Sequence, residues 1–102
     1  MIIAVDFDGT LVSDKFPEIG EPYWDVVNRL KECQQNGAKI ILWTCRNKEF
    51  LKEAVAFCSD IGLHFDAIND NLDEIKVLYD GDTRKVFADE YWDDKAVNPT
   101  WQ

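Results

Sequence analysis

The sequence predicts a single α/β domain over residues 1–102, with a mainly parallel central sheet. Four apolar runs alternate with stretches of helical periodicity, and this order favours right-handed crossovers between parallel strands. Polar residues directly follow three of the four runs, where open parallel sheets place their ligands. A chain of 102 residues can bury roughly two-thirds of its unfolded surface as one small domain.

The first predicted strand covers residues 2–5, whose apolar, β-branched content is typical of a buried parallel strand. It leads into Asp6-Phe7-Asp8-Gly9-Thr10-Leu11. Two carboxylates at the end of a buried strand are costly unless a cation lies beside them. Gly9 permits a sharp turn immediately after the strand.

Two helices are expected on the basis of apolar spacing. Pro22 suits the first turn of one helix and Gly37 its end, whereas Asn47 suits the cap of the other and Gly62 its end. The expected inner stripes are Tyr23, Val26, Val27, Leu30 and Cys33 in the first helix, and Phe50, Leu51, Ala54, Val55, Cys58 and Ile61 in the second. Trp24, Trp43 and Trp92 are expected in the core.

The other strands are predicted at residues 40–43, 63–68 and 86–92. Thr44 follows the second run, and the acid pair Asp93-Asp94 follows the last. Residues 72–79 favour a short helix, and the chain after Ala96 is expected to be irregular.

The charge balance is strongly acidic. Asp and Glu number 20 against 11 Lys and Arg, for a net charge of −9. This field repels nucleic acid and anionic membranes, although a phosphorylated nucleic-acid end needs only a local cationic patch.

Cys33, Cys45 and Cys58 are odd in number and lack metal-site spacing, which indicates reduced thiols. No apolar run approaches the roughly 20 residues of a membrane span, and the first strand is too short for a secretory signal. We therefore expect a cytoplasmic protein without a membrane partner.

The polar groups at the strand ends should meet at one edge of the sheet. Mg²⁺ would relieve the repulsion among the carboxylates and leave positions for a substrate phosphate. The Thr44 hydroxyl and the Lys85 ammonium suit phosphoryl oxygens. One of Asp6 and Asp8 could act as a covalent nucleophile and the other as a general acid and base. Arg46 is a candidate substrate contact.

These residues resemble the four motifs of the haloacid dehalogenase (HAD) superfamily, in that family's order. Residues 6–11 resemble motif I, residues 40–44 resemble motif II, and residues 85–96 resemble the fused third and fourth motifs of small capless members. Two departures are Glu90, inside an apolar strand, and Lys95, where arginine is more usual.

The resemblance implies a Rossmann-like three-layer sandwich without a cap domain, and a Mg²⁺-dependent phosphohydrolase. It makes Asp6 the nucleophile and a metal ligand, and Asp8 the acid/base with its carbonyl on the metal. Thr44 and Lys85 would hold the phosphoryl group. Asp93 would bind Mg²⁺, and Asp94 would be a second ligand or an outer-shell partner.

Two other functions remain open. A catalytically idle binding or assembly module fits the small size, and a phospho-accepting receiver domain uses similar residues at its strand ends. The acid pair after the last strand argues against a receiver, which carries its acid pair on the first strand. An uncovered site would suit a bulky phosphorylated substrate, a neighbouring subunit that covers it, or a permissive small-molecule phosphatase. The sequence leaves the substrate itself unidentified.

Overall fold

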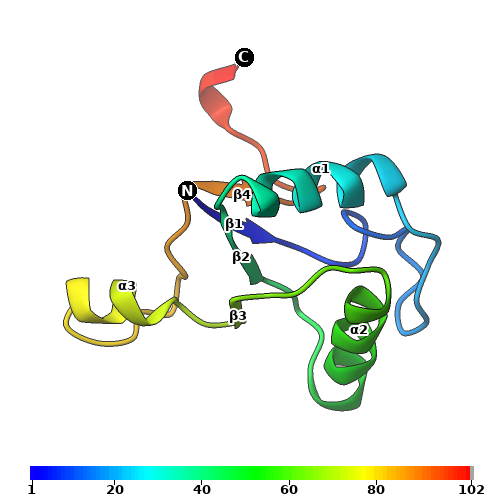
Figure 1. The fold of residues 1–102 in the computed structure, drawn as a ribbon, viewed down its shortest axis with the longest axis horizontal. Helices are drawn as coiled ribbons and strands as arrows, with labels where there is room; N and C mark the ends of the chain where they lie inside the picture. Colours follow the sequence, from blue (N-terminus) through cyan, green and yellow to red (C-terminus); the bar gives the residue numbers. More distant parts are fainter. Residues whose placement is uncertain (102) are drawn as a thin grey trace.

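A computed structural model describes residues 1–101 as a four-stranded parallel sheet with three α-helices (Figure 1). The strands are β1 (Ile2–Val5), β2 (Lys39–Leu42), β3 (Ala67–Ile68) and β4 (Glu90–Trp92). The helices are α1 (Trp24–Gln35), α2 (Lys48–Asp60) and α3 (Asp73–Leu78), followed by a 3-10 turn, η1 (Pro99–Trp101). The parallel α/β architecture expected from the sequence is confirmed.

The strand order is β3-β2-β1-β4, so β1 lies between two parallel neighbours. Val5, the last residue of β1, is paired with Leu42 of β2 and with Trp92 of β4. This register places the residues that follow all three strands at one edge of the sheet. Asp6, Trp43 and Asp93 are therefore close in space although far apart in the sequence.

The two faces of the sheet bury separate apolar clusters. Ile3 and Val5 face a cluster that includes Val27 and Leu30 of α1 and Ala54 of α2. Ala4 and Ile41 face a smaller cluster that includes Ile75 of α3 and residues 86 and 88. The alternation along β1 explains why its run is apolar throughout: both faces of this central strand are covered.

The predicted helix ends are confirmed at three places. The Asn47 side chain accepts a hydrogen bond from the backbone N–H of Lys48, at 2.9 Å. Gly37 and Gly62 follow α1 and α2 with φ of 98° and 89°. After each helix the glycine N–H bonds back into the last turn, at 3.1 Å for Gly37 and 3.0 Å for Gly62. The short helix expected within residues 72–79 is α3.

The start of α1 was predicted wrongly. Pro22 forms an isolated antiparallel bridge with Val12, and the Tyr23 N–H bonds to the Leu11 carbonyl at 2.8 Å. The chain first returns beside the segment that follows β1, so the helix begins only at Trp24. Tyr23 and Trp24 are therefore 43% and 50% exposed instead of lying in the core.

The last two strands are shorter than predicted. Residues 63–65 do not join β3, because the Leu63 N–H closes the end of α2 on the Cys58 carbonyl at 2.8 Å. Residues 86–89 do not join β4. Side chains take the N–H groups of Phe87 and Ala88, whereas the Asp89 N–H donates to the Ile2 carbonyl of β1 at 2.8 Å. The Asn71 amide oxygen accepts from the Phe87 N–H at 2.7 Å, and the Tyr91 hydroxyl contacts the Ala88 N–H at 3.2 Å.

Glu90 thus begins an edge strand and does not interrupt a buried one. Its side chain is exposed, and its carboxylate accepts from the Trp92 indole at 3.0 Å. Within the described part of the chain, none of the helices has the length and apolar character needed to cross a bilayer.

Candidate functional site

The candidate site begins where β1 ends. The backbone N–H of Asp6 donates to the carbonyl of Trp92 at 2.9 Å, which extends the pairing of β1 with β4 by one residue. The Asp6 carboxylate accepts from the N–H of Phe7 at 2.7 Å. Its side chain is thereby held at the carboxyl edge of the sheet, next to the chain that leaves β4.

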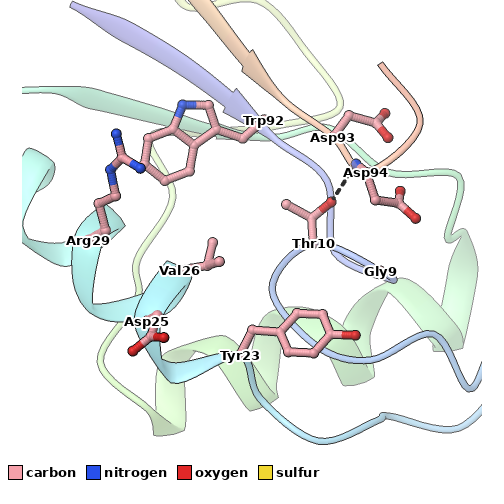
Figure 2. A pocket seen from close by; sticks show the side chains of 9 residues that line it. All are labelled: Gly9, Thr10, Tyr23, Asp25, Val26, Arg29, Trp92, Asp93 and Asp94. Atoms are coloured by element: carbon pink, nitrogen blue, oxygen red, sulfur yellow. Dashed lines mark hydrogen bonds between the residues drawn. The ribbon is translucent and has the colours of Figure 1, made fainter. Parts of the chain in front are cut away.

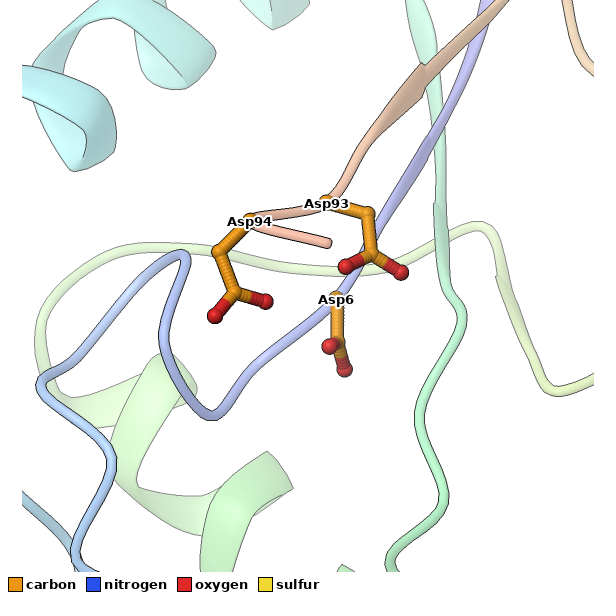
Figure 3. Close-up of side chains that lie close together, drawn as sticks. All are labelled: Asp6, Asp93 and Asp94. Atoms are coloured by element: carbon orange, nitrogen blue, oxygen red, sulfur yellow. The ribbon is translucent and has the colours of Figure 1, made fainter. Parts of the chain in front are cut away.

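Three carboxylates meet at this edge. Asp6, Asp93 and Asp94 each offer one oxygen, and these oxygens all lie within 4.8 Å of one another (Figure 3). Asp6 is partly buried, whereas the other two are exposed. The pairing of β1 with β4 brings together acids from opposite ends of the sequence, as the spacing of the motifs predicts.

The crowding of these acids changes the ionisation of Asp6. The pKa of Asp6 is raised from 3.8 to about 6, chiefly by burial; the charges of Asp93, Asp94 and Asp8 also raise this pKa, and the hydrogen bond from Phe7 opposes the rise. Like charges 4 Å apart repel by about 4 kcal/mol at an effective dielectric of 20. A cation bound among these acids would relieve this repulsion.

Gly9 allows Asp94 to approach the turn after β1. Gly9 has φ of +86°, and a Cβ at this position would lie 2.5 Å from the Asp94 Oδ2. The Thr10 hydroxyl accepts from the Asp94 N–H at 3.1 Å, from the other side of the same turn. The turn after β1 therefore positions both Asp6 and Asp94.

Asp8 is paired with a buried arginine. Arg46 Nε donates to Asp8 Oδ2 and Arg46 Nη2 to Asp8 Oδ1, both at 2.8 Å. The arginine side chain has no exposed surface, and that of Asp8 is 15% exposed. Two parallel bonds of this kind fix the plane of a carboxylate as well as its position.

Every N–H of the Arg46 guanidinium is used. Besides Asp8, it donates to the carbonyls of Pro17, Glu18 and Phe50 at 3.2, 2.8 and 3.3 Å. The occupied N–H groups argue against the expected contact between Arg46 and substrate, because each already has a partner within the protein. Instead, it ties Asp8 to residues 13–21, which we call the 13–21 loop.

Thr44 lies at the same edge, after β2. Its hydroxyl oxygen accepts from the Arg46 N–H at 3.2 Å, and its own N–H donates to the Asn69 side chain at 2.8 Å. Asn69 follows β3, so this hydrogen bond links the turn after β3 to the turn after β2.

One open cavity of about 460 Å³ contains most of the predicted site. Three predicted acids and Thr44 line it together with charged, thiol and aromatic residues, whereas the predicted acid Asp94 does not. The lining residues are Asp6, Asp8, Asp14, Phe16, Thr44, Cys45, Arg46, Asp93 and Lys95. Lys95 Nζ lies 3.2 Å from Asp94 Oδ2. Sequence reasoning missed Phe16 and Asp14, because nothing in the local pattern says that the 13–21 loop folds over the site.

Lys85 does not line this cavity in the structure. It is exposed, and its Nζ lies 5.4 Å from the centroid of the Tyr91 ring. The lysine that does line the cavity is Lys95, the residue at which the sequence departs from the motif.

A second cavity of about 380 Å³ shares Asp93 with the first and is also lined by Asp94 (Figure 2). Tyr23 and Trp92 line it, and the guanidinium of Arg29 lies 5.5 Å from the Trp92 ring centroid. Neither Asp6 nor Asp8 belongs to its lining.

The donor set fits a hard divalent cation. In an octahedral Mg²⁺ shell, neighbouring ligands are roughly 3 Å apart and opposite ligands roughly 4 Å apart. The oxygens of Asp6, Asp93 and Asp94, within 4.8 Å of one another, would therefore move inward to share one ion. All three are carboxylate oxygens, the ligand type that Mg²⁺ prefers.

Comparison with known proteins gives one informative match. No protein-family model matches the chain, and no curated protein matches it. A solved structure, described as that of a conserved protein coded by a locus of Bacteroides thetaiotaomicron, shares 43% identity and superposes with a TM-score of 0.85. The match covers 95% of this chain and 78% of that one.

Proposed function

The chain belongs to the same family as the conserved Bacteroides thetaiotaomicron protein, and we propose that it is a Mg²⁺-dependent phosphohydrolase that acts through an aspartyl-phosphate on Asp6. One observation carries the proposal. A carboxylate with a raised pKa, two further acids at metal-ligand spacing and an arginine-oriented aspartate meet at one sheet edge. This combination has a clear use in phosphoryl transfer.

In the first step an Asp6 oxygen attacks phosphorus, and the bond from phosphorus to the leaving oxygen breaks. Asp8 gives a proton to that oxygen. In the second step Asp8 takes a proton from water, the water oxygen bonds to phosphorus, and the bond to Asp6 breaks to release inorganic phosphate. Both Asp8 oxygens accept from Arg46 in this structure, so Asp8 would give up one of these bonds to carry the proton, while the other bond keeps the carboxyl group oriented.

Asp6, Asp93 and Asp94 would hold the metal ion, together with the Asp8 backbone carbonyl that the HAD resemblance names. When bound, Mg²⁺ would offset the charge of the acids and of the phosphoryl oxygens. Thr44 lines the cavity with a hydroxyl that can donate to a phosphoryl oxygen. The resemblance also supports the finer expectation of a capless, three-layer HAD-like sandwich, and the odd number of cysteines supports that of a cytoplasmic location.

Two lysines are candidates for the ammonium that neutralises the phosphoryl group. The resemblance names Lys85, whereas the cavity lining contains Lys95. Lys85→Met and Lys95→Met, assayed side by side, identify the residue. The lysine whose loss lowers kcat by 100-fold or more is the phosphoryl partner, on the order expected for one preorganised charge at the reacting group.

The decisive assay measures phosphate release from 4-nitrophenyl phosphate and from a panel of sugar phosphates, nucleotides and phosphorylated oligonucleotide ends. We expect release with Mg²⁺, none with EDTA, and none from Asp6→Asn. Asp60→Asn, which removes an exposed charge at the end of α2, is the matched control and should behave as wild type.

Two outcomes would contradict the proposal. Absence of Mg²⁺-dependent release from every substrate would favour the idle binding module. Wild-type turnover by Asp6→Asn would remove Asp6 as nucleophile. A phospho-accepting receiver would instead keep a stable acyl-phosphate after treatment with acetyl phosphate, which intact-mass measurement would detect.

A further inference from the structure

We propose that the cavity at Asp6 takes phosphate monoesters whose leaving group carries an aromatic ring, and that this ring packs on Phe16. The inference rests on the proposed function, because it names the substrate class of the same site. Three features carry it: the placement of Phe16, the fixed shape of the 13–21 loop, and the charges around the cavity.

Phe16 lines the cavity together with Asp6 and Asp8, yet 53% of its surface is exposed. The Arg46 guanidinium lies 5.1 Å from its ring centroid, and the Phe50 ring meets it edge to face at 5.3 Å. These two contacts hold the ring in place and leave about half of it open to a ligand. A planar group that packs on this ring removes apolar surface from water.

The loop that carries Phe16 is anchored at its tip and at its base. At the tip, Arg46 binds the carbonyls of Pro17 and Glu18. At the base, the Ser13 N–H donates to the Glu21 carbonyl at 2.8 Å, and the Glu21 N–H donates to Ser13 Oγ at 2.9 Å.

Gly20 completes the base of this loop. A Cβ at Gly20 would lie 2.0 Å from the Ser13 carbonyl oxygen, so only glycine fits there. Because the 13–21 loop is already held in one conformation, it loses little conformational entropy when a ligand binds. Phe16 is therefore a preorganised surface beside the reacting groups.

The charges favour a single phosphate. Both cations that line the cavity are already paired, Arg46 with Asp8 and Lys95 with Asp94. Asp14 adds a further negative charge to the lining, at the start of the same loop as Phe16. A second phosphate on the substrate would thus meet a carboxylate with no unpaired cation among the described lining residues. A neutral aromatic leaving group meets no such penalty.

The neighbouring cavity is a poorer place for the leaving group, although it is also aromatic. Tyr23 and Trp92 line it, but Asp8 does not, and Asp8 must reach the leaving oxygen. Phe16 is the aromatic residue that shares a cavity with both Asp6 and Asp8.

The experiment compares kcat/KM for 1-naphthyl phosphate and ethyl phosphate, with Mg²⁺. Phe16→Ala should lower the ratio of the two constants threefold to tenfold, roughly what an aromatic pair contributes, and Phe16→Tyr should restore it. The matched control is Trp24→Ala, which removes a 50% exposed aromatic side chain outside this cavity and should leave the ratio unchanged. An unchanged ratio in Phe16→Ala would overturn the inference and leave the phosphohydrolase standing.

A binding measurement separates this inference from the proposed function. Calorimetry with Mg²⁺ uses Asp6→Asn as background, so that no turnover occurs. Tighter binding of 1-naphthyl phosphate than of ethyl phosphate, lost when Phe16→Ala is added, supports the aromatic site even if no substrate is hydrolysed. Equal binding of the two esters overturns it. Tighter binding of adenosine 5′-diphosphate than of adenosine 5′-monophosphate would overturn the preference for a single phosphate.

Discussion

Arg46 and Asp8 form a two-point ion pair, with both hydrogen bonds at 2.8 Å and no exposed surface on the arginine. The same guanidinium holds the carbonyls of Pro17, Glu18 and Phe50. One side chain thus joins the proposed acid/base to the loop over the site and to α2. Arg46 is a positioning residue, since its donors are all occupied by the protein itself.

Arg46→Met should destabilise the fold by about 3–5 kcal/mol, because it leaves a largely buried carboxylate unpaired. Urea unfolding checks this value. Arg84→Met, which removes an exposed arginine, should change stability by less than about 0.5 kcal/mol. Adding Asp8→Asn to Arg46→Met should recover part of the loss, and a double variant less stable than Arg46→Met would contradict the pairing.

Arg46→Lys separates positioning from charge, because lysine keeps the cation but not the planar fork. We expect kcat to fall at least tenfold while KM for ethyl phosphate changes little. The pH profile of kcat should also shift relative to wild type. A profile and a kcat equal to those of wild type would show that the orientation of Asp8 does not depend on Arg46.

Stability should fall with rising pH because of Asp6. The folded-state pKa of about 6 lies above the starting value of 3.8, so the folded protein holds this proton more tightly than the unfolded chain does. The carboxyl therefore lowers stability progressively between pH 3.8 and about 6, and fully above that range.

Melting temperatures measured in EDTA test whether ionised Asp6 lowers the stability of the folded protein. Asp6→Asn should melt above wild type at pH 8, and the difference should vanish at pH 4. Asp60→Asn controls for the loss of one negative charge. Saturating Mg²⁺ should stabilise wild type through binding to the folded state, and an Asp6→Asn variant that is less stable at pH 8 in EDTA would refute the burial effect.

Gly9→Ala should destabilise the fold for two separate reasons. A side chain at φ of +86° is strained by about 1–2 kcal/mol, and its Cβ would strike the Asp94 carboxylate. Gly37→Ala is the matched control, because Gly37 has φ of +98° and nothing within 4 Å. Urea unfolding should show a larger loss for Gly9→Ala, and Asp94→Ala should bring the two losses together.

The three cysteines should differ in reactivity. Cys45 is exposed and lines the cavity, whereas Cys58 is buried, and burial raises the pKa of its thiol to about 12. A chromogenic disulfide reagent should modify Cys45 in a fast phase that Cys45→Ser removes. Cys58→Ala should leave that phase unchanged, and a fast phase that survives in Cys45→Ser would contradict the assignment.

Features fixed by short stretches of sequence were predicted well. The residues 2–5 strand, the Asn47 cap and the glycines after α1 and α2 depend on neighbours in the chain. The meeting of Asp6 with Asp93 and Asp94 followed from strand order and from the place where parallel strands carry ligands.

The rest of the site depends on contacts between distant residues. Arg46 and Asp8 are 38 residues apart, and no periodicity links them. Residues 86–89 read as a strand, but the Asn71 side chain takes the Phe87 N–H that a strand partner would have bound. In the same way, the fold of the 13–21 loop, and not its composition, brings Phe16 over Arg46.

The short outer strands have a consequence for behaviour in concentrated solution. The longest strands, β1 and β2, lie inside the sheet, while β3 and β4 at its edges have two and three residues. Long, flat edges offer rows of unpaired backbone groups that recruit other copies of a chain into aggregates. Here each edge offers few such groups to template a ladder, so lengthening either outer strand should make this sheet more prone to self-association.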